Sequence, residues 1–134
     1  MPATDWMLTS HSIEIRVRYQ ETDAQGRVHH ANYLKWFELG RVELLRASGH
    51  SYRELEEAGV FLVVAEAAVT FHQPASFDDL LTLTTTTVKA KGARIEHRYE
   101  VRRGSELLAT GTTIVACIDQ NGRVSRLPKW LRMA

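Results

Sequence analysis

The sequence predicts an α+β fold, in which one long helix covers one face of an antiparallel sheet. Three observations lead to this prediction: a single long helical pattern, four strand patterns that follow it in succession, and short glycine-containing turns between those strands. Strands that succeed one another through short turns pair in antiparallel fashion. A lone long helix must then pack on one face of the sheet.

The chain reads as one domain over residues 1–134. Its length is sufficient for one hydrophobic core, and the sequence contains no internal repeat or linker. A formal net charge of +1 gives no general attraction to nucleic acid, and the single cysteine, Cys117, excludes an internal disulfide. The N-terminus lacks a signal-peptide pattern, and no apolar run is long enough to span a membrane. We therefore expect a cytoplasmic protein without membrane insertion.

The first predicted element is a half-buried strand over residues 13–19. Its apolar face consists of Ile13, Ile15, Val17 and Tyr19, and charged residues alternate with them. The polar segment that follows, residues 20–27, contains Gly26 and predicts a tight turn.

The long helix is predicted over residues 31–47. Its buried stripe is expected to consist of Leu34, Phe37, Arg41, Leu44 and Leu45. Gly40 lies inside this helix, where glycine costs about 1 kcal/mol relative to alanine. Two explanations for Gly40 are open: close approach by a neighbouring backbone, or a tolerated surface glycine. A short second helix is predicted over residues 51–58, with Ser51 and Glu54 as a capping box.

Four strands are predicted after Gly59. The first presents one face made of Phe61, Val63, Ala65, Ala67, Val69 and Phe71, and the second, residues 80–91, is rich in threonine. In the third, Ile95, His97, Tyr99 and Val101 alternate with charged residues. In the last, residues 106–118, the prediction places Leu108, Ile114 and Ile118 on one face and Leu107, Val115 and Cys117 on the other. Because one helix cannot cover both faces, this strand indicates a second subunit.

Asp23 lies in the predicted turn, seven residues before the helix start near His30. An aspartate in a turn commonly accepts hydrogen bonds from nearby backbone N–H groups, which is a purely structural role. The alternative is chemical, since a helix N-terminus can hold an oxygen that becomes negative during a reaction. A carboxylate beside such a site could attack a carbonyl or activate a water molecule. Together these groups are the minimum components for acyl transfer.

The stretch "RYQETDAQGRVHHANYLKWFELGRVELLR", residues 18–46, resembles the signature of the 4-hydroxybenzoyl-CoA thioesterase family of hotdog-fold proteins. It is especially similar to the branch of short bacterial acyl-CoA thioesterases associated with the Tol-Pal system. The residues that carry the resemblance are Tyr19, Thr22, Asp23, Gly26, residues 28–30, Asn32 and Tyr33. The resemblance implies a curved antiparallel sheet wrapped around the central helix. It also implies homodimers with active sites between subunits, and a homotetramer built as a dimer of dimers.

The resemblance also implies roles for individual residues. Asp23 would be the catalytic carboxylate, acting either as nucleophile or as general base, and the backbone N–H of His30 would polarise the thioester carbonyl. The positions expected to contact substrate are Gly26, Arg27, His29 and Tyr33, although Arg27 stands where the family commonly has a small or aliphatic residue. The only cofactor-like group expected is coenzyme A, as part of the substrate. A hotdog protein that binds acyl-CoA or an acyl carrier protein without hydrolysis is the alternative.

Other charged residues have competing interpretations. Glu38 on the helix and Glu66 on a strand are rival carboxylates, although surface positions explain both more simply. The histidines show no metal-ligand spacing, so no metal site is predicted. Lys89, Lys91 and Arg94 flank a predicted turn and could bind the phosphates of coenzyme A. The same cations could instead pair with glutamates on a solvated sheet face.

Overall fold

The computed structural model describes residues 8–133. Residues 1–7 lie outside the described residues, and the prediction that the N-terminus lacks a signal peptide falls mostly on them. The helices are α1 (Ala31–Ala47) and α2 (Tyr52–Glu57), and the strands are β1 (Ser10–Arg16), β2 (Phe61–Phe71), β3 (Leu80–Lys91), β4 (Arg94–Arg103) and β5 (Glu106–Ile118). Two short 3₁₀ helices lie at Tyr19–Glu21 and Lys129–Leu131. The bounds of α1 agree with the predicted helix.

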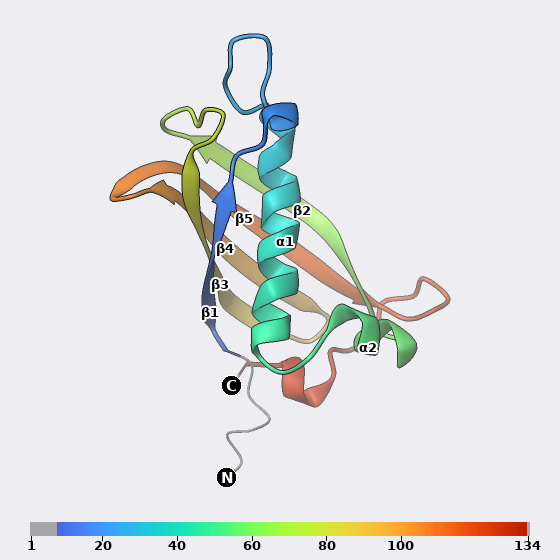
Figure 1. Ribbon diagram of the computed structural model, residues 1–134. Coiled ribbons are helices and arrows are strands. Elements are labelled where there is room, and N and C mark those ends of the chain that lie inside the picture. The colour runs from blue at the N-terminus through green and yellow to red at the C-terminus, as the bar shows by residue number, and fades with distance from the viewer. Residues whose placement is uncertain (1–7, 134) are drawn as a thin grey trace.

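The five strands form one antiparallel sheet in the order β1-β3-β4-β5-β2. The sheet curves around α1, which runs along its concave face (Figure 1). The α+β architecture predicted from the pattern, and the hotdog arrangement implied by the resemblance, are therefore confirmed. Because β1 and β2 each pair with one strand in the described chain, they are the two edges of the sheet.

The first strand lies three residues earlier than predicted, because β1 runs from Ser10 to Arg16 and Tyr19 begins a 3₁₀ turn. The turn is favoured because the Glu21 carboxylate accepts a hydrogen bond from the Arg18 backbone N–H at 2.7 Å. Tyr19 is consequently 77% exposed instead of lying on the buried face. The predicted helix stripe is also wrong at one position, since Leu34 is exposed and Tyr33 and Trp36 are buried.

β-bulges overturn two of the predicted strand faces. In β5, Val101 pairs with Ala109 and Arg102 with Leu107, which leaves Leu108 as an extra residue. Leu108 therefore lies on the buried face together with Val115 and Cys117, contrary to the prediction. In β2, Ala65 is the extra residue between Val64 and Glu66, so the predicted alternation does not continue along the strand. One inserted residue reverses the direction of every side chain beyond it.

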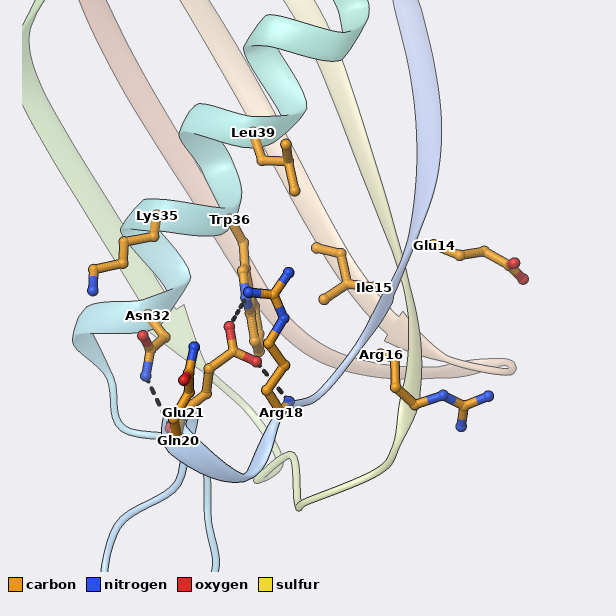
Figure 2. Close-up of a pocket in the computed structure, with 10 residues that line it drawn as sticks. All are labelled: Glu14, Ile15, Arg16, Arg18, Gln20, Glu21, Asn32, Lys35, Trp36 and Leu39. Carbon is orange, nitrogen blue, oxygen red and sulfur yellow. Dashed lines mark hydrogen bonds between the residues drawn. The ribbon is translucent and has the colours of Figure 1, made fainter.

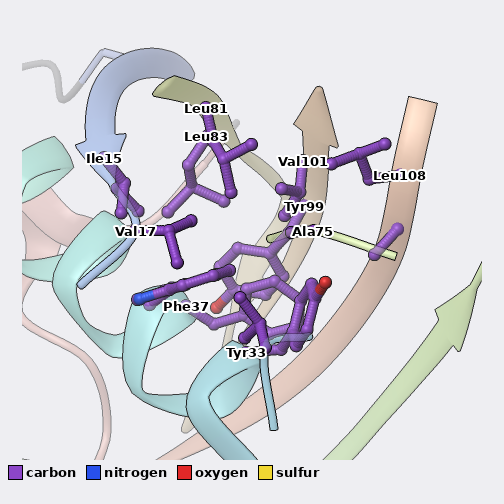
Figure 3. Packing of buried hydrophobic residues seen from close by; sticks show 13 residues of the cluster. Ile15, Val17, Tyr33, Phe37, Ala75, Leu81, Leu83, Tyr99, Val101 and Leu108 are labelled. Carbon is purple, nitrogen blue, oxygen red and sulfur yellow. The ribbon is translucent and has the colours of Figure 1, made fainter. Parts of the chain in front are cut away.

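The core contains two hydrophobic clusters on the helix side of the sheet. The first includes Tyr33, Phe37 and Tyr99 near the start of α1, and the rings of Phe37 and Tyr99 stack with centroids 4.1 Å apart (Figure 3). The second includes Leu45, Ala90 and Ile95 near the end of α1.

Gly40 and Arg41 occupy the middle of α1, on the face that packs against the sheet. A Cβ atom at Gly40 would overlap the Thr85 hydroxyl and lie 2.9 Å from Leu83 Cδ2, so Gly40 is a close-approach position, against β3 side chains instead of backbone. The buried Arg41 guanidinium donates to the Tyr99 hydroxyl at 3.1 Å. A polar layer, defined by Arg41, Thr85, Thr87, His97 and Thr113, is thus buried in the core. Burial, with a smaller effect from the charge of Arg41, lowers the pKa of His97 to about 3.

Candidate active site

Residues 23–27 form a closed turn between β1 and α1. The Asp23 N–H donates to the Arg27 carbonyl at 2.7 Å, and Gly26, with φ of +79°, returns its N–H to the Asp23 carbonyl at 3.0 Å. Asp23 Oδ1 accepts hydrogen bonds from the N–H groups of Gln25 and Arg27, at 2.8 and 3.3 Å. The structural role predicted for Asp23 is therefore present. Its other oxygen, Oδ2, has no partner among residues 8–133, and so remains available for chemistry.

His30 precedes the first residue of α1, and its backbone N–H has no hydrogen-bond partner in the described chain. The neighbouring amides are occupied: His29 N–H donates to the Glu21 carbonyl at 2.8 Å, and Ala31 N–H donates to His29 Nδ1 at 3.2 Å. The His29 and His30 rings stack at 4.3 Å. An unused amide at the positive end of a helix is a suitable donor for an oxyanion.

Asp23 and His30 line the same cavity, which has a volume of about 410 Å³. The remaining lining residues come from the β1–α1 region and from the end of β2, and they are Gln25, Arg27, Val28, His29, Tyr33, Phe71, His72, Gln73 and Pro74. The cavity thus contains every site residue predicted from the β1–α1 segment except Gly26, which shapes the turn.

The cavity wall formed by residues 71–74 was not identified from the sequence. A backbone hydrogen bond from Val28 N–H to the Ala75 carbonyl, at 2.9 Å, joins the two segments. Tyr33 packs edge-on against Phe71, with ring centroids 5.0 Å apart. Burial raises the pKa of Tyr33 and thus favours the protonated hydroxyl. The signal available in the sequence was the polar His-Gln-Pro segment directly after an apolar strand.

The predicted phosphate-binding cations lie elsewhere. Lys89, Lys91 and Arg94 line a separate hollow of about 210 Å³ with Glu96 and Ile114. Arg94 lies 3.9 Å from Glu66 across the solvated face, and both side chains are about two-thirds exposed. This β3–β4 turn is near the end of α1, whereas the loop between β1 and α1, which contains residues 23–27, is near its beginning (Figure 1). The 17-residue helix is about 25 Å long, and the two groups lie toward its opposite ends in a single chain.

The rival carboxylates, together with His50 and His97, are outside the cavity, whereas His72 lines it. Glu38 is exposed on α1, and Glu66 is exposed on the edge strand β2. His50 stacks on Trp130 with ring centroids 3.8 Å apart, and His97 is buried in the core. Among residues 8–133, no three side chains of the metal-binding types gather into a cluster. Within the same range, no helix has the length and apolar character required to cross a membrane.

A larger hollow, of about 710 Å³, lies between β1 and α1 (Figure 2). It is lined by Glu14, Ile15, Arg16, Arg18, Gln20, Glu21, Asn32, Lys35, Trp36 and Leu39, none of which was predicted to bind substrate. Both carboxylate oxygens of Glu21 are already acceptors, from the Arg18 N–H and the Trp36 indole N–H. Size alone therefore does not identify the reactive site. The smaller cavity brings together Asp23 Oδ2 and the His30 N–H at the start of α1, neither of which has a hydrogen-bond partner among residues 8–133.

Comparisons with known proteins identify the family of this chain. The sequence profile of the thioesterase-like superfamily matches residues 17–134. The chain is 38% identical over 109 residues to the acyl-CoA thioesterase YbgC of Haemophilus influenzae, covering 81% of this chain and 80% of that protein. It is 33% identical over 106 residues to the acyl-CoA thioester hydrolase YbgC of Escherichia coli, covering 78% and 79%. The crystal structure of a DHNA-CoA thioesterase from Staphylococcus aureus superimposes with a TM-score of 0.85 at 30% identity, covering 90% of this chain and 82% of that one.

Proposed function

Because the chain belongs to the thioesterase-like superfamily, we propose that it hydrolyses an acyl-CoA thioester to the free acid and coenzyme A. The observation that carries this proposal is the shared cavity of Asp23 and His30, in which one carboxylate oxygen and one backbone amide have no partner among residues 8–133. A thioester carbonyl between them would meet a base or nucleophile on one side and a hydrogen-bond donor on the other.

Two routes use these groups. In the first, Asp23 Oδ2 bonds to the thioester carbon, the carbon–sulfur bond breaks, and water then hydrolyses the resulting anhydride while the thiolate takes up a proton. In the second, Asp23 accepts a proton from water as the hydroxide adds to the same carbon. The tetrahedral intermediate then expels the thiolate, which takes up the proton from Asp23. In both routes the His30 N–H donates to the oxygen that becomes negative. The two hydrogen bonds to Oδ1 would keep the carboxylate oriented.

The cavity walls suggest how substrate is held. Val28, Tyr33 and Phe71 provide an apolar wall for the acyl group. Arg27 and His29 lie at the same cavity on exposed positions, where they would contact the polar thioester end of the substrate.

We expect the working enzyme to be a homodimer joined through β2. This edge strand is largely exposed, with Val63 at 41%, Val64 at 49% and Phe71 at 51%. Phe71 also lines the cavity, so a second copy on this edge would complete the site. Lys89, Lys91 and Arg94 would then bind the coenzyme A phosphates of another subunit's substrate. Pairing of dimers into a homotetramer is part of the same proposal.

The test is a thiol-release assay over a panel of aliphatic and aromatic acyl-CoAs. The wild-type chain is expected to turn over at least one of them, and Asp23→Asn to lower kcat by about 100-fold or more. Asparagine retains one oxygen for the turn, so circular dichroism should show an unchanged fold. A folded Asp23→Asn variant with wild-type turnover would disprove the catalytic role. Stoichiometric acyl-CoA binding without thiol release by the wild type would support the binding protein instead.

A further inference from the structure

The His30 amide can serve as an oxyanion donor only if the peptide before α1 is held in one orientation. No hydrogen bond in the described chain restrains that N–H itself. The restraint comes from its neighbours, because the His29 N–H and the Asn32 side-chain amide both donate to the carbonyl of Glu21, at 2.8 and 2.9 Å. The direction of the His30 amide therefore depends on where the Glu21 peptide lies.

Glu21 is in turn fixed by its own side chain. Its Oε2 accepts the indole N–H of Trp36 at 2.9 Å, and its Oε1 accepts the Arg18 N–H at 2.7 Å (Figure 2). Trp36 is only 3% exposed and packs against Tyr33 with ring centroids 4.8 Å apart. The carboxylate thus ties the 3₁₀ turn to the second turn of α1, a buried and rigid part of the fold.

The hydrogen bonds of the Glu21 carboxylate also restrain the segment that carries Asp23, the other reactive group. Asp23 is two residues after Glu21, and the intervening Thr22 pairs with Val28 in an isolated bridge and donates its hydroxyl to the Tyr19 carbonyl at 2.7 Å. The two reactive groups of the candidate active site, Asp23 and the His30 amide, are therefore both positioned by the segment that Glu21 anchors. The Glu21 carboxylate faces the larger hollow and does not line the Asp23 cavity, so it would act without touching substrate.

We infer that Glu21 is a positioning residue, whose carboxylate holds the His30 amide and Asp23 in register for the reaction through Trp36 and Arg18. This inference rests on the proposed thioester hydrolysis. It assigns to Glu21 an effect on turnover, because misplacement of a reacting group slows the chemical step more than it weakens substrate binding.

The direct test is Glu21→Gln. The amide has one acceptor oxygen for two donors, so either the Trp36 indole N–H or the Arg18 N–H loses its partner. We expect kcat to fall about tenfold or more while KM changes less than about twofold. The matched control is Glu14→Gln, which makes the same charge change in the same hollow at a side chain that has no hydrogen bond in the described chain. Its kcat is expected to stay within about twofold of wild type.

A second variant separates positioning from general damage. Trp36→Phe removes the indole donor and keeps an aromatic ring, so it should lower kcat in the same way. If the hydrogen bond between Glu21 and Trp36 is responsible, the double variant Glu21→Gln with Trp36→Phe should have a kcat no lower than that of the slower single variant. The two losses in kcat would then be non-additive. Additive losses, a change confined to KM, or an equal loss in Glu14→Gln would each overturn the inference.

The His30 backbone amide resonance gives a readout that does not depend on activity. Its ¹H and ¹⁵N shifts should move in Glu21→Gln and not in Glu14→Gln, measured well below the unfolding temperature of each variant. An unmoved His30 resonance in Glu21→Gln would overturn the inference even if the wild type is an active thioesterase. Conversely, a wild type that hydrolyses no acyl-CoA would overturn the proposed function and leave the NMR result to decide the role of Glu21.

Discussion

Two turns of this chain have the same construction and lie in different surroundings. Residues 23–27 read DAQGR and residues 119–123 read DQNGR. In the second turn the Asp119 N–H donates to the Arg123 carbonyl at 2.8 Å, and the Gly122 N–H donates to the Asp119 carbonyl at 3.0 Å. Asp119 Oδ1 accepts from the N–H groups of Asn121 and Arg123, at 2.8 and 3.0 Å. Each bond has its counterpart at Asp23.

The difference lies in the helix end that each turn faces. The Asp23 turn shares a cavity with the start of α1 and the free His30 amide. The Asp119 turn shares a hollow of about 300 Å³ with Glu57, Ala58 and Gly59 at the end of α2. A helix C-terminus presents carbonyl oxygens and the negative end of the dipole, which oppose a developing oxyanion. The turn fixes the carboxylate, and under the proposed mechanism the neighbouring helix end decides whether that carboxylate can act in catalysis.

The largest expected difference follows from changing each aspartate to asparagine. Asp23→Asn should lower kcat by about 100-fold or more, whereas Asp119→Asn should leave it within about twofold. Both variants retain the turn oxygen, so their urea unfolding midpoints should be alike. Similar activity losses in both variants would show that the comparison reflects turn stability and not chemistry.

The two turn glycines should be equivalent in stability and not in function. Gly26 and Gly122 both have φ of +79°, and a Cβ at either position would meet no atom within 4 Å. Alanine should therefore lower the unfolding free energy by about 1–2 kcal/mol in each case, through backbone strain alone. Urea titration measures this effect, and thiol release from the folded protein should fall only for Gly26→Ala. Unequal destabilisation would mean that the two turns are not the same structure.

The arginines that close the turns provide a smaller contrast. Arg27 lines the candidate cavity, and Arg123 does not line the hollow beside Asp119. Arg27→Ala should raise KM for acyl-CoA by about two- to fivefold, the effect expected from the loss of one exposed ion pair. The rise in KM should be smaller at high salt. Arg123→Ala serves as the control, with an unchanged KM. A KM that rises equally in both variants would remove Arg27 from the substrate contacts.

The smallest effect is expected from exchanging the central residues of the turns. Ala24→Gln with Gln25→Asn gives the first turn the sequence of the second. Because Gln25 contacts the aspartate through its backbone N–H, as Asn121 does in the second turn, the side-chain exchange should leave kcat within about twofold. A large loss would assign Gln25, which lines the cavity, a substrate contact of its own.

The sequence predicted most of what depends on local periodicity. The bounds of α1 and the buried face of β4, which contains Ile95, His97, Tyr99 and Val101, follow from repeats of 3.6 and 2 residues. The bulges at Ala65 and Leu108 were not predictable, because one inserted residue leaves the composition unchanged while it reverses the faces.

The candidate site was predictable on one side only. Asp23, His29, His30 and Tyr33 lie in one continuous motif, whereas residues 71–74 reach the cavity through a contact between distant segments, from Val28 to Ala75. The turn at Asp119 shows the same limit, since its sequence resembles that at Asp23 and only the fold places the two beside different helix ends.

The buried His97 links the stability of this fold to acidity. A free histidine takes up a proton near pH 6.5, whereas His97 in the folded chain, beside the Arg41 charge, resists protonation until about pH 3. Since the unfolded chain binds the additional proton in this window, stability is fully present above about pH 6.5 and declines as the pH falls toward 3. Each pH unit removes about 1.4 kcal/mol, from a total that is typically about 5–15 kcal/mol. One uncharged imidazole between the helix and the sheet thus gives the protein an internal limit on the acidity in which it can stay folded.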